Sequence, residues 1–328
     1  MRDAQVTIIG AGLSGIMAAR TLRLNGVEDV QLIDKGKSVG GRLATRRIEG
    51  GKADHGAQFF TVRSQELQQY VEDWREKGWI KHWFGDPYPR YTSVDGMNTL
   101  AKRLAEDLDP ELNTRITSIK ESIGGFQLTS EEGNTCTTGA LIITCPLPQT
   151  VTLLEESRVS FDPEKFNQIK NVSVSPAFVG LFEVTGETTI PSSGHVDKGL
   201  PEGVERMVDH YKKGISDKRI ISIYMDSEWS ETHFEQDEEE VTRLIKDLGK
   251  EFIPFESIRS EQLKRWRYAQ SAQVISQPFL NLHDALPLFI AGDTFLYEED
   301  ETARTRFESA FRSGIAAGEH VSGLVKQL

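Results

Sequence analysis

The sequence predicts an α/β protein in which a parallel sheet, extended by a small antiparallel meander, carries an inserted α+β domain. Residues 6–9 form a short β-branched run that ends in glycine, residues 13–24 carry apolar side chains at helical spacing, and residues 30–33 form a second apolar run. A strand, a helix and a strand in this order form a βαβ unit, which requires a parallel sheet with helices on its faces. The C-terminus returns to this pattern, because the apolar run in "LPLFIAGD" precedes a long helical stretch in "TRFESAFRSGIAAGEHVSGLV".

Composition and charge are typical of a globular protein large enough for two domains. The chain has 328 residues, of which 38% are hydrophobic and 27% charged, and its formal net charge is −12. An acidic surface repels phosphate groups, so we expect neither nucleic acid nor an anionic membrane as a partner.

The apolar N-terminal stretch has only Arg2 as a basic residue and is interrupted by glycines, which disfavours a signal peptide. No apolar run reaches the ~18 residues of a spanning helix. Cys136 and Cys145 form no CxxC motif, which favours a reducing cytoplasm.

Periodicity predicts the elements that follow the opening unit. Residues 65–77 and 97–108 predict helices, residues 115–119 predict a strand, and residues 126–137 predict a small antiparallel hairpin around "EEGN". A buried strand is expected over residues 140–144, where two prolines follow. The segment from Gly78 to Arg90 is rich in aromatic residues and proline, and we expect an irregular surface or pocket segment there.

From about residue 151 to residue 281 the pattern changes to longer strands and helices. "PAFVGLFEV" and "RIISIYM" predict strands, and residues 241–252 predict an amphipathic helix behind the acidic run "EQDEEE", which favours a helix N-terminus. We therefore predict a discontinuous nucleotide-binding domain at residues 1–64, 95–150 and 282–328. A substrate domain is expected at residues 65–94 and 151–281.

The strand-to-helix junction carries the sequence G-x-G-x-x-G at Gly10, Gly12 and Gly15. In a Rossmann-like unit these glycines permit a tight turn, a close approach of a pyrophosphate to the backbone, and close packing of helix on strand. The phosphates then lie at a helix N-terminus, where free N–H groups favour anions. Asp34 ends the next strand, 24 residues after Gly10, and is placed to accept hydrogen bonds from a ribose 2′-OH. An acid there disfavours the 2′-phosphate of NADP.

These features do not separate NAD from FAD, because both carry adenosine diphosphate. A second glycine pair, Gly40 and Gly41, stands in "GGRLATRR" and would let a loop pass near the diphosphate. Arg42 would offer its oxygens a fork of donors. A surface turn with solvated arginines explains the same residues, and the roles of Arg46 and Arg47 stay open.

The motifs "GAGLSG", "GGRLATRR", "ADHGAQFF", "LFIAGDTF" and "ESAFRSGIAAG" together resemble those of flavin-containing amine oxidases and related FAD oxidoreductases. Within that superfamily, "DHGAQFFTVR", "VDGMNTLAKRLAEDL" and "KRWRYAQ" are most similar to the renalase-like branch. The resemblance covers both ends and the middle of the chain. It implies non-covalent FAD, since neither cysteine matches the position of covalent flavin attachment in the family.

The resemblance also assigns residues to the cofactor. Asp293 would contact the ribityl or diphosphate region, Ile116 would meet the adenine side from a parallel strand, and Gln58 and Phe59 would lie against the flavin. A helix that begins near Ser309 and Ala310 would point its N-terminus at the flavin N1–C2=O edge, where reduction builds negative charge. The complete set of expected cofactor contacts is Gly10, Gly12, Leu13, Ser14, Gly15, Asp34, Lys35, Gly41, Arg42, Gln58, Phe59, Ile116, Gly292, Asp293, Ser309 and Ala310.

One departure from the family separates two classes of substrate. Many amine oxidases of the superfamily keep a lysine that holds a water near flavin N5, on the strand that corresponds to "SVSPAFVGLFE". Residues 171–183 contain no lysine. This weakens the interpretation as a simple amine oxidase and favours the renalase-like one.

Candidates for the substrate side are less sharply defined. Trp266, Tyr268, Phe60, Phe295 and the segment 79–88 would form an aromatic wall over the flavin, or they pack as ordinary core and interface residues. His55 is either a structural histidine or a catalytic base. The other histidines are scattered without metal-ligand spacing, and no hydrolase motif is present, so we expect no metal and no hydrolytic chemistry.

The sequence therefore predicts an FAD-dependent oxidase that takes a hydride at flavin N5 and passes electrons to O2 to give H2O2. Resemblance to renalase implies isomers of reduced NAD(P) as substrates and NAD(P)⁺ as product. The alternatives are an amine oxidase or desaturase acting on another small molecule, a non-catalytic binding protein of the same fold, and an NAD-dependent dehydrogenase that uses only Gly10–Gly15.

Overall fold

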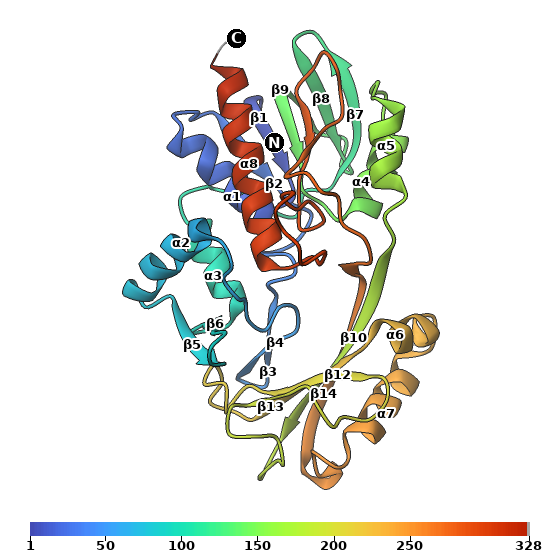
Figure 1. Cartoon of the computed structure of the whole chain (residues 1–328). Coiled ribbons are helices and arrows are strands. Elements are labelled where there is room, and N and C mark those ends of the chain that lie inside the picture. The colour runs from blue at the N-terminus through green and yellow to red at the C-terminus, as the bar shows by residue number, and fades with distance from the viewer. Residues whose placement is uncertain (327–328) are drawn as a thin grey trace.

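The chain forms two lobes in the computed structural model, which describes residues 1–326 (Figure 1). The first lobe is built on a sheet in the order β15-β16-β9-β1-β2. Its central strands β1 (Ala4–Ile9), β2 (Val30–Ile33), β9 (Thr135–Ile143) and β16 (Leu288–Ile290) are parallel, and β15 (Leu280–Asn281) pairs antiparallel at one edge. The predicted βαβ opening is confirmed, and α1 (Leu13–Leu24) has the expected bounds.

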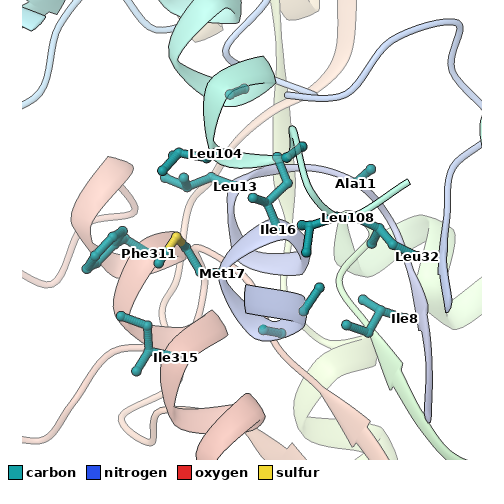
Figure 2. Packing of buried hydrophobic residues seen from close by; sticks show 14 of the residues in the cluster. Ile8, Ala11, Leu13, Ile16, Met17, Leu32, Leu104, Leu108, Phe311 and Ile315 are labelled. Atoms are coloured by element: carbon teal, nitrogen blue, oxygen red, sulfur yellow. The ribbon is translucent and has the colours of Figure 1, made fainter. Parts of the chain in front are cut away.

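Alternate side chains of the parallel strands enter two separate cores, because successive residues of a strand point to opposite faces. Val6 and Ile8 face α1, α3 (Met97–Leu104) and α8 (Phe307–Val325). Ile9 and Ile33 face α4 (Leu147–Glu155), α5 (Pro163–Lys170) and the antiparallel meander. Figure 2 shows the first core, where Met17 of α1 lies toward Phe311 and Ile315 of α8.

The meander differs from the prediction in two respects. Strand β7 (Ile116–Ser122) pairs antiparallel with β8 (Gly125–Ser130), so the strand that carries Ile116 is not parallel as expected. The hairpin arm and the buried strand predicted separately around residues 126–144 are one continuous strand, β9. Its first half pairs antiparallel with β8 and its second half pairs parallel with β1, which is why its sequence changes character near Gly139.

The segment 65–94 contains the predicted helix, followed by a β-hairpin where irregular chain was expected for residues 78–90. Helix α2 (Gln65–Glu76) is followed by β5 (Ile80–Phe84) and β6 (Arg90–Ser93), which form an antiparallel hairpin. The buried side chains of this segment, including Trp74 and Tyr91, lie in the same core as α1, α3 and α8. By core packing the segment therefore joins the first lobe, although we predicted it in the substrate domain.

The second lobe is a five-stranded antiparallel sheet in the order β11-β12-β13-β10-β14. Its strands are β10 (Val174–Val184), β11 (His195–Val196), β12 (Val204–Asp209), β13 (Ile220–Met225) and β14 (Ile258–Ser271). One face packs on α6 (Ser227–His233) and α7 (Glu238–Gly249), and a short 3-10 helix (Phe255–Ser257) precedes β14. The other face packs on a hairpin of the first lobe, β3 (Thr45–Ile48) and β4 (Gly51–Asp54).

Helix α7 begins three residues before the predicted start, at Glu238, because the side chain of Asp237 accepts a hydrogen bond from Glu239 N and caps it. The acidic run thus supplies the first turn of the helix. Within residues 1–326, no helix combines the length and the apolar character needed to cross a membrane. The same residues contain no group of three His, Cys, Asp or Glu side chains arranged to hold a metal ion.

Candidate cofactor and substrate site

The first glycine motif forms the turn from β1 into α1. A methyl group at Gly15 would lie 1.8 Å from the carbonyl oxygen of Gly10, so only glycine permits this approach of helix to strand. A methyl group at Gly12 would meet no atom within 4 Å. Gly12 therefore borders open space at the N-terminus of α1, the kind of position where a diphosphate binds.

The second glycine pair lies directly against the first. Gly40 N donates a hydrogen bond to Ala11 O at 2.7 Å, and Gly40 forms a parallel β-bridge with Gly12. A methyl group at Gly41 would lie 3.4 Å from Gly12 Cα. The loop "GGRLATRR" thus forms a wall of the space in front of α1.

Asp34 closes the same loop from the end of β2. Its Oδ2 accepts a hydrogen bond from Ala11 N and its Oδ1 accepts one from Gly36 N, each at 2.6 Å. Each carboxylate oxygen has a further lone pair for a ribose hydroxyl. Lys35 is exposed instead, and its ammonium donates to Gln149 Oε1 at 2.8 Å.

Arg42 and Asp293, which stand 251 residues apart, form a bidentate ion pair. The two N–O distances are 2.8 and 2.5 Å, and Arg42 also donates to the carbonyl oxygen of Ala269 at 3.2 Å. The pair lines a cavity whose other walls include Cys145, Gly292 and Phe295. We predicted contact of each residue with the cofactor, but not this pairing.

Helix α8 contacts Gly292, a residue that lines this cavity. Gly292 N donates to Ser313 Oγ of α8 at 2.9 Å, and the space beside Gly292 is open. The helix begins at Phe307, slightly before the predicted start at Ser309 and Ala310. Ser309 Oγ accepts a hydrogen bond from Arg306 N, so this hydroxyl caps the helix.

Glu308, in the first turn of α8, is a buried acid that we did not predict. Its Oε1 accepts hydrogen bonds from Ser64 N at 2.7 Å and from Ser64 Oγ at 2.6 Å. Because Ser64 is the N-cap of α2, the carboxylate joins the N-termini of α2 and α8.

The residues around this space meet the requirements of FAD. Open space lies beside Gly12, at the N-terminus of α1, and beside Gly292, which is hydrogen-bonded to α8. The buried Ser14 Oγ has no hydrogen-bond partner among the described residues. Leu13 is buried in the core on one face of the sheet, and Ile116 is buried in the same core as Ile33 on the other. These donors and walls suit an elongated dinucleotide with an anionic centre.

A buried ion pair fixes the turn that contains Gln58 and Phe59. Lys213 and Asp54 are both fully buried, with Lys213 Nζ 2.7 Å from Asp54 Oδ2. Lys213 also donates to Gln58 O at 2.7 Å and to Gln58 Oε1 at 2.8 Å. Burial lowers the pKa of Lys213 and Asp54 opposes this shift; the three acceptors favour the ammonium form.

Further hydrogen bonds complete this network. Asp54 Oδ1 accepts from Thr45 Oγ1 at 2.5 Å and from Met97 N at 2.9 Å, so it also anchors the start of α3. Gln58 Nε2 donates to the Tyr224 hydroxyl, which donates to Gly56 O at 3.0 Å. The network joins the two lobes and supports the turn with Gln58 and Phe59, which we expect to lie against the flavin.

His55 and Trp266, two candidates for the substrate side, are brought together. Their rings stack with centroids 5.4 Å apart, and Trp266 Nε1 donates to His55 O at 2.8 Å. Burial, and then the charge of Lys264, lower the pKa of His55 to about 4. His55 is therefore neutral near pH 7, and its buried Nδ1 has no partner within the described chain.

The remaining aromatic candidates divide into two groups. Phe59 contacts Trp83, Phe84 and His195 edge-on, in a cluster that joins β5 to β11. Phe60 is a core residue, not part of an aromatic wall, because it is 2% exposed and stacks on Phe307 at 4.2 Å. Phe295 is buried at the cavity beside Arg42. Tyr268 is half-buried on β14, between Trp266 and the carbonyl that binds Arg42.

Comparison with known proteins identifies the family. A model of the NAD(P)-binding Rossmann-like domain matches residues 8–74, and a model of the flavin containing amine oxidoreductase family matches residues 73–322. Hydroxyneurosporene desaturase of Rubrivivax gelatinosus is 35% identical over 63 residues, which are 19% of this chain and 12% of that protein. Polyamine oxidase 4 of Oryza sativa subsp. japonica is 35% identical over 71 residues, which are 22% of this chain and 14% of that protein. The chain thus matches only a small part of these relatives' lengths.

Solved structures share the whole architecture. A protein assigned as a protoporphyrinogen oxidase of Exiguobacterium sp. 255-15 has a TM-score of 0.73 and 12% identity, with 98% of this chain and 99% of that chain covered. Putrescine oxidase with bound putrescine has a TM-score of 0.67 and 14% identity, with both chains fully covered. At such identity the likeness shows the fold alone.

Proposed function

Because the chain belongs to the flavin containing amine oxidoreductase family and is an FAD-dependent oxidoreductase, we propose that it oxidises isomers of reduced NAD(P) to NAD(P)⁺. When bound, FAD supplies the hydride acceptor at N5 and the route for electrons to O2, which yields H2O2. The residues that would hold it are the glycine turns, Asp34, the Arg42–Asp293 pair and the N-termini of α1 and α8.

The observation that carries the choice of substrate is the absence of a lysine from residues 171–183, which include most of β10. Many amine oxidases of the superfamily keep a lysine there that holds a water. Lys213 is fully buried, but its ammonium donates all three N–H groups to Asp54 and Gln58, so none is free to hold a water. This arrangement supports a substrate that needs only orientation for hydride loss.

The chain's own contribution is to orient and to exclude water. Gln58 and Phe59 are held by the Lys213–Asp54 pair, so we propose them as the rigid surface against the ring of the cofactor. Trp266 with the neutral His55 would form the opposite wall. A dihydropyridine ring loses a hydride without a proton transfer, so no acid or base is required of His55.

Anaerobic reduction tests the proposal directly. The purified yellow protein is mixed without oxygen with isomers of NADH and NADPH, with normal NADH and NADPH, and with a panel of primary amines and polyamines. We expect the flavin absorbance to bleach with the isomers and not with the amines. Readmission of oxygen then restores the colour and releases H2O2.

Three results would overturn the proposal. Bleaching by an amine alone would favour the alternative, an amine oxidase or desaturase, and bleaching by normal NADH alone would indicate a reductase. A protein that holds FAD but is bleached by no donor of the panel would also remove the proposed substrate. The proposed cytoplasmic location is tested separately by fractionation.

A further inference from the structure

Lys264 of β14 and Arg46 of β3 are two cations that form no ion pair within residues 1–326. Gln262, Lys264 and Trp266 alternate along β14 and therefore lie on one face of the sheet. This is the face that packs on the hairpin β3–β4, because Val179, opposite Lys264, is buried against Ile48 and Ala53. Side chains of the hairpin and of β14 thus meet along this line.

Two hairpin contacts fix the position of Lys264. Arg46 Nε donates to Gln262 Oε1 at 3.2 Å, and His55 stacks on Trp266. Lys264 stands between Gln262 and Trp266, so it lies between Arg46 and His55. Gln262, Lys264 and Trp266 are each half-buried, so this line of side chains borders solvent.

Lys264 is a half-buried cation without a partner. Among residues 1–326 its ammonium has no hydrogen bond and no carboxylate within 4.0 Å, and Arg46 uses only Nε. Burial, and then the charge of Arg46, lower the pKa of Lys264; the attraction of Glu238 is weaker. The two cations, Lys264 and Arg46, form a site that attracts an anion.

We propose that Lys264 and Arg46 form an anion subsite that binds a phosphate of the substrate beside the Trp266–His55 stack. Arg46 offers the fork of its two terminal nitrogens, and Lys264 offers a point charge two residues, or ~7 Å, along the strand from Trp266. In a nicotinamide nucleotide one ribose separates the ring from its phosphate. The identification of the anion as a substrate phosphate rests on the proposed function, whereas the subsite itself does not.

The subsite also accounts for selectivity. The chain has a net charge of −12, which repels an anionic substrate at long range and attracts a polyamine. A local cationic pair reverses this preference where the substrate must bind. Binding of a cationic amine at the same place would set like charges together.

Calorimetry on the FAD-loaded protein tests the subsite with inorganic pyrophosphate at low salt. We expect binding to the native protein, and a loss of affinity of about tenfold or more in Lys264→Gln and in Arg46→Gln. Lys264→Arg should keep the affinity within about threefold. Arg259→Gln is the matched control, because Arg259 is an exposed arginine of the same strand without an ion pair in the described chain, and it should bind as the native protein does. No binding to the native protein, or equal binding to all variants, would overturn the proposal.

A second measurement separates the subsite from the proposed reaction. The rate of anaerobic flavin reduction is compared between an isomer of NADPH and the reduced nicotinamide riboside with the same isomeric ring. The riboside has no phosphate. Lys264→Gln should slow reduction by the phosphorylated donor about tenfold and leave the riboside within about twofold. Equal slowing with both donors would contradict the subsite. If neither donor reduces the flavin while pyrophosphate binding depends on Lys264, the proposed reaction fails and the subsite stands.

Discussion

Alanine substitutions at Gly12 and Gly15, three residues apart, should have different effects on the stability of the apoprotein. Gly12→Ala meets no protein atom, so the free energy of unfolding of the apoprotein should change by less than about 1 kcal/mol. Its methyl group would occupy the space of the diphosphate, and the affinity for FAD should fall at least about tenfold. Urea unfolding and flavin titration of the apoprotein measure the two effects.

Gly15→Ala is the contrasting variant. Its methyl group would overlap Gly10 O, so α1 must move from β1, and the apoprotein should lose about 3 kcal/mol of stability. FAD affinity falls in this variant too, but together with stability. If Gly12→Ala binds FAD as well as the native protein does, the open space beside Gly12 is not the diphosphate site.

The Lys213–Asp54 pair predicts strong coupling between two residues. Lys213→Met leaves the buried Asp54 carboxylate without its cation and should cost about 3–5 kcal/mol. Asp54→Asn keeps the acceptor for Thr45 and Met97 but isolates the lysine. In the double variant neither charge is left unpaired, so its cost should be smaller than the sum of the single costs by about 1–3 kcal/mol. Denaturant unfolding of all four proteins measures this, and additive costs would contradict the pairing.

The residues of the site differ in how far the sequence reveals them. The glycine turns and Asp34 were predictable because each follows a recognisable strand end within one βαβ unit. The Arg42–Asp293 pair was not, because it joins residues 251 positions apart. Lys213 stands in "HYKKG", a polar stretch that reads as exposed, and only the three-dimensional contact with Asp54 buries it.

At the scale of elements, the packing of α8 on α1 depends on glycine. A methyl group at Gly314 would lie 2.2 Å from Ser14 O of α1, and one at Gly318 would lie 2.8 Å from Ala18 O. Gly314→Ala should therefore separate the helices, destabilise the protein by about 2–3 kcal/mol and weaken FAD binding.

Gly323 provides a control in the same helix. It is exposed and a methyl group there meets no atom, so Gly323→Ala should stabilise the protein by up to about 1 kcal/mol through helix propensity. Thermal unfolding measures both variants. Changes of the same sign in both would show that close packing does not decide the effect at Gly314.

Which elements were predictable follows from where their signals lie. α1 and β2 have complete local signals, namely period and punctuating glycines, and their bounds were predicted as found. The direction of β7 was predicted wrongly because the choice of β8 as partner is not written in the strand itself. The β5–β6 hairpin was missed because its aromatic residues and prolines hide the alternation of a strand.

At the scale of the whole molecule, the two lobes are joined by buried polar contacts as well as by chain connections. Ser222 of the second lobe donates to Asp54 O at 3.0 Å and is 2.6 Å from His210 Nε2. His210 is fully buried, and burial lowers its pKa well below the usual value. Burial is also the largest cause that lowers the pKa of His55 and of His195, in each case to about 4.

These three histidines predict how stability depends on pH. In the unfolded chain a histidine binds a proton below a pKa of ~6.5, whereas in the folded protein His55 and His195 resist protonation down to about 4, and burial lowers the pKa of His210 as well. Between these values the unfolded state holds more protons, so the free energy of unfolding must fall as the pH is lowered. The slope should reach at most about 1.4 kcal/mol per pH unit for each histidine.

Other groups act in different ranges or with the opposite sign, which makes the histidine contribution separable. Hydrogen bonds to the carboxylates of Asp3 and Glu121 lower their pKa, so their contribution is lost as the pH falls through the ordinary carboxyl values of 3.8 and 4.5, at the acid end of the range. Burial raises the pKa of Glu66, so protonation of this carboxyl favours folding as the pH falls toward its ordinary pKa.

Urea unfolding from pH 7 to pH 4.5 should show the slope reduced in the double variant His55→Gln/His195→Gln. His82→Gln, which removes an exposed histidine, should leave it unchanged. If the slope is the same in all three proteins, the buried histidines do not cause the loss of stability on acidification.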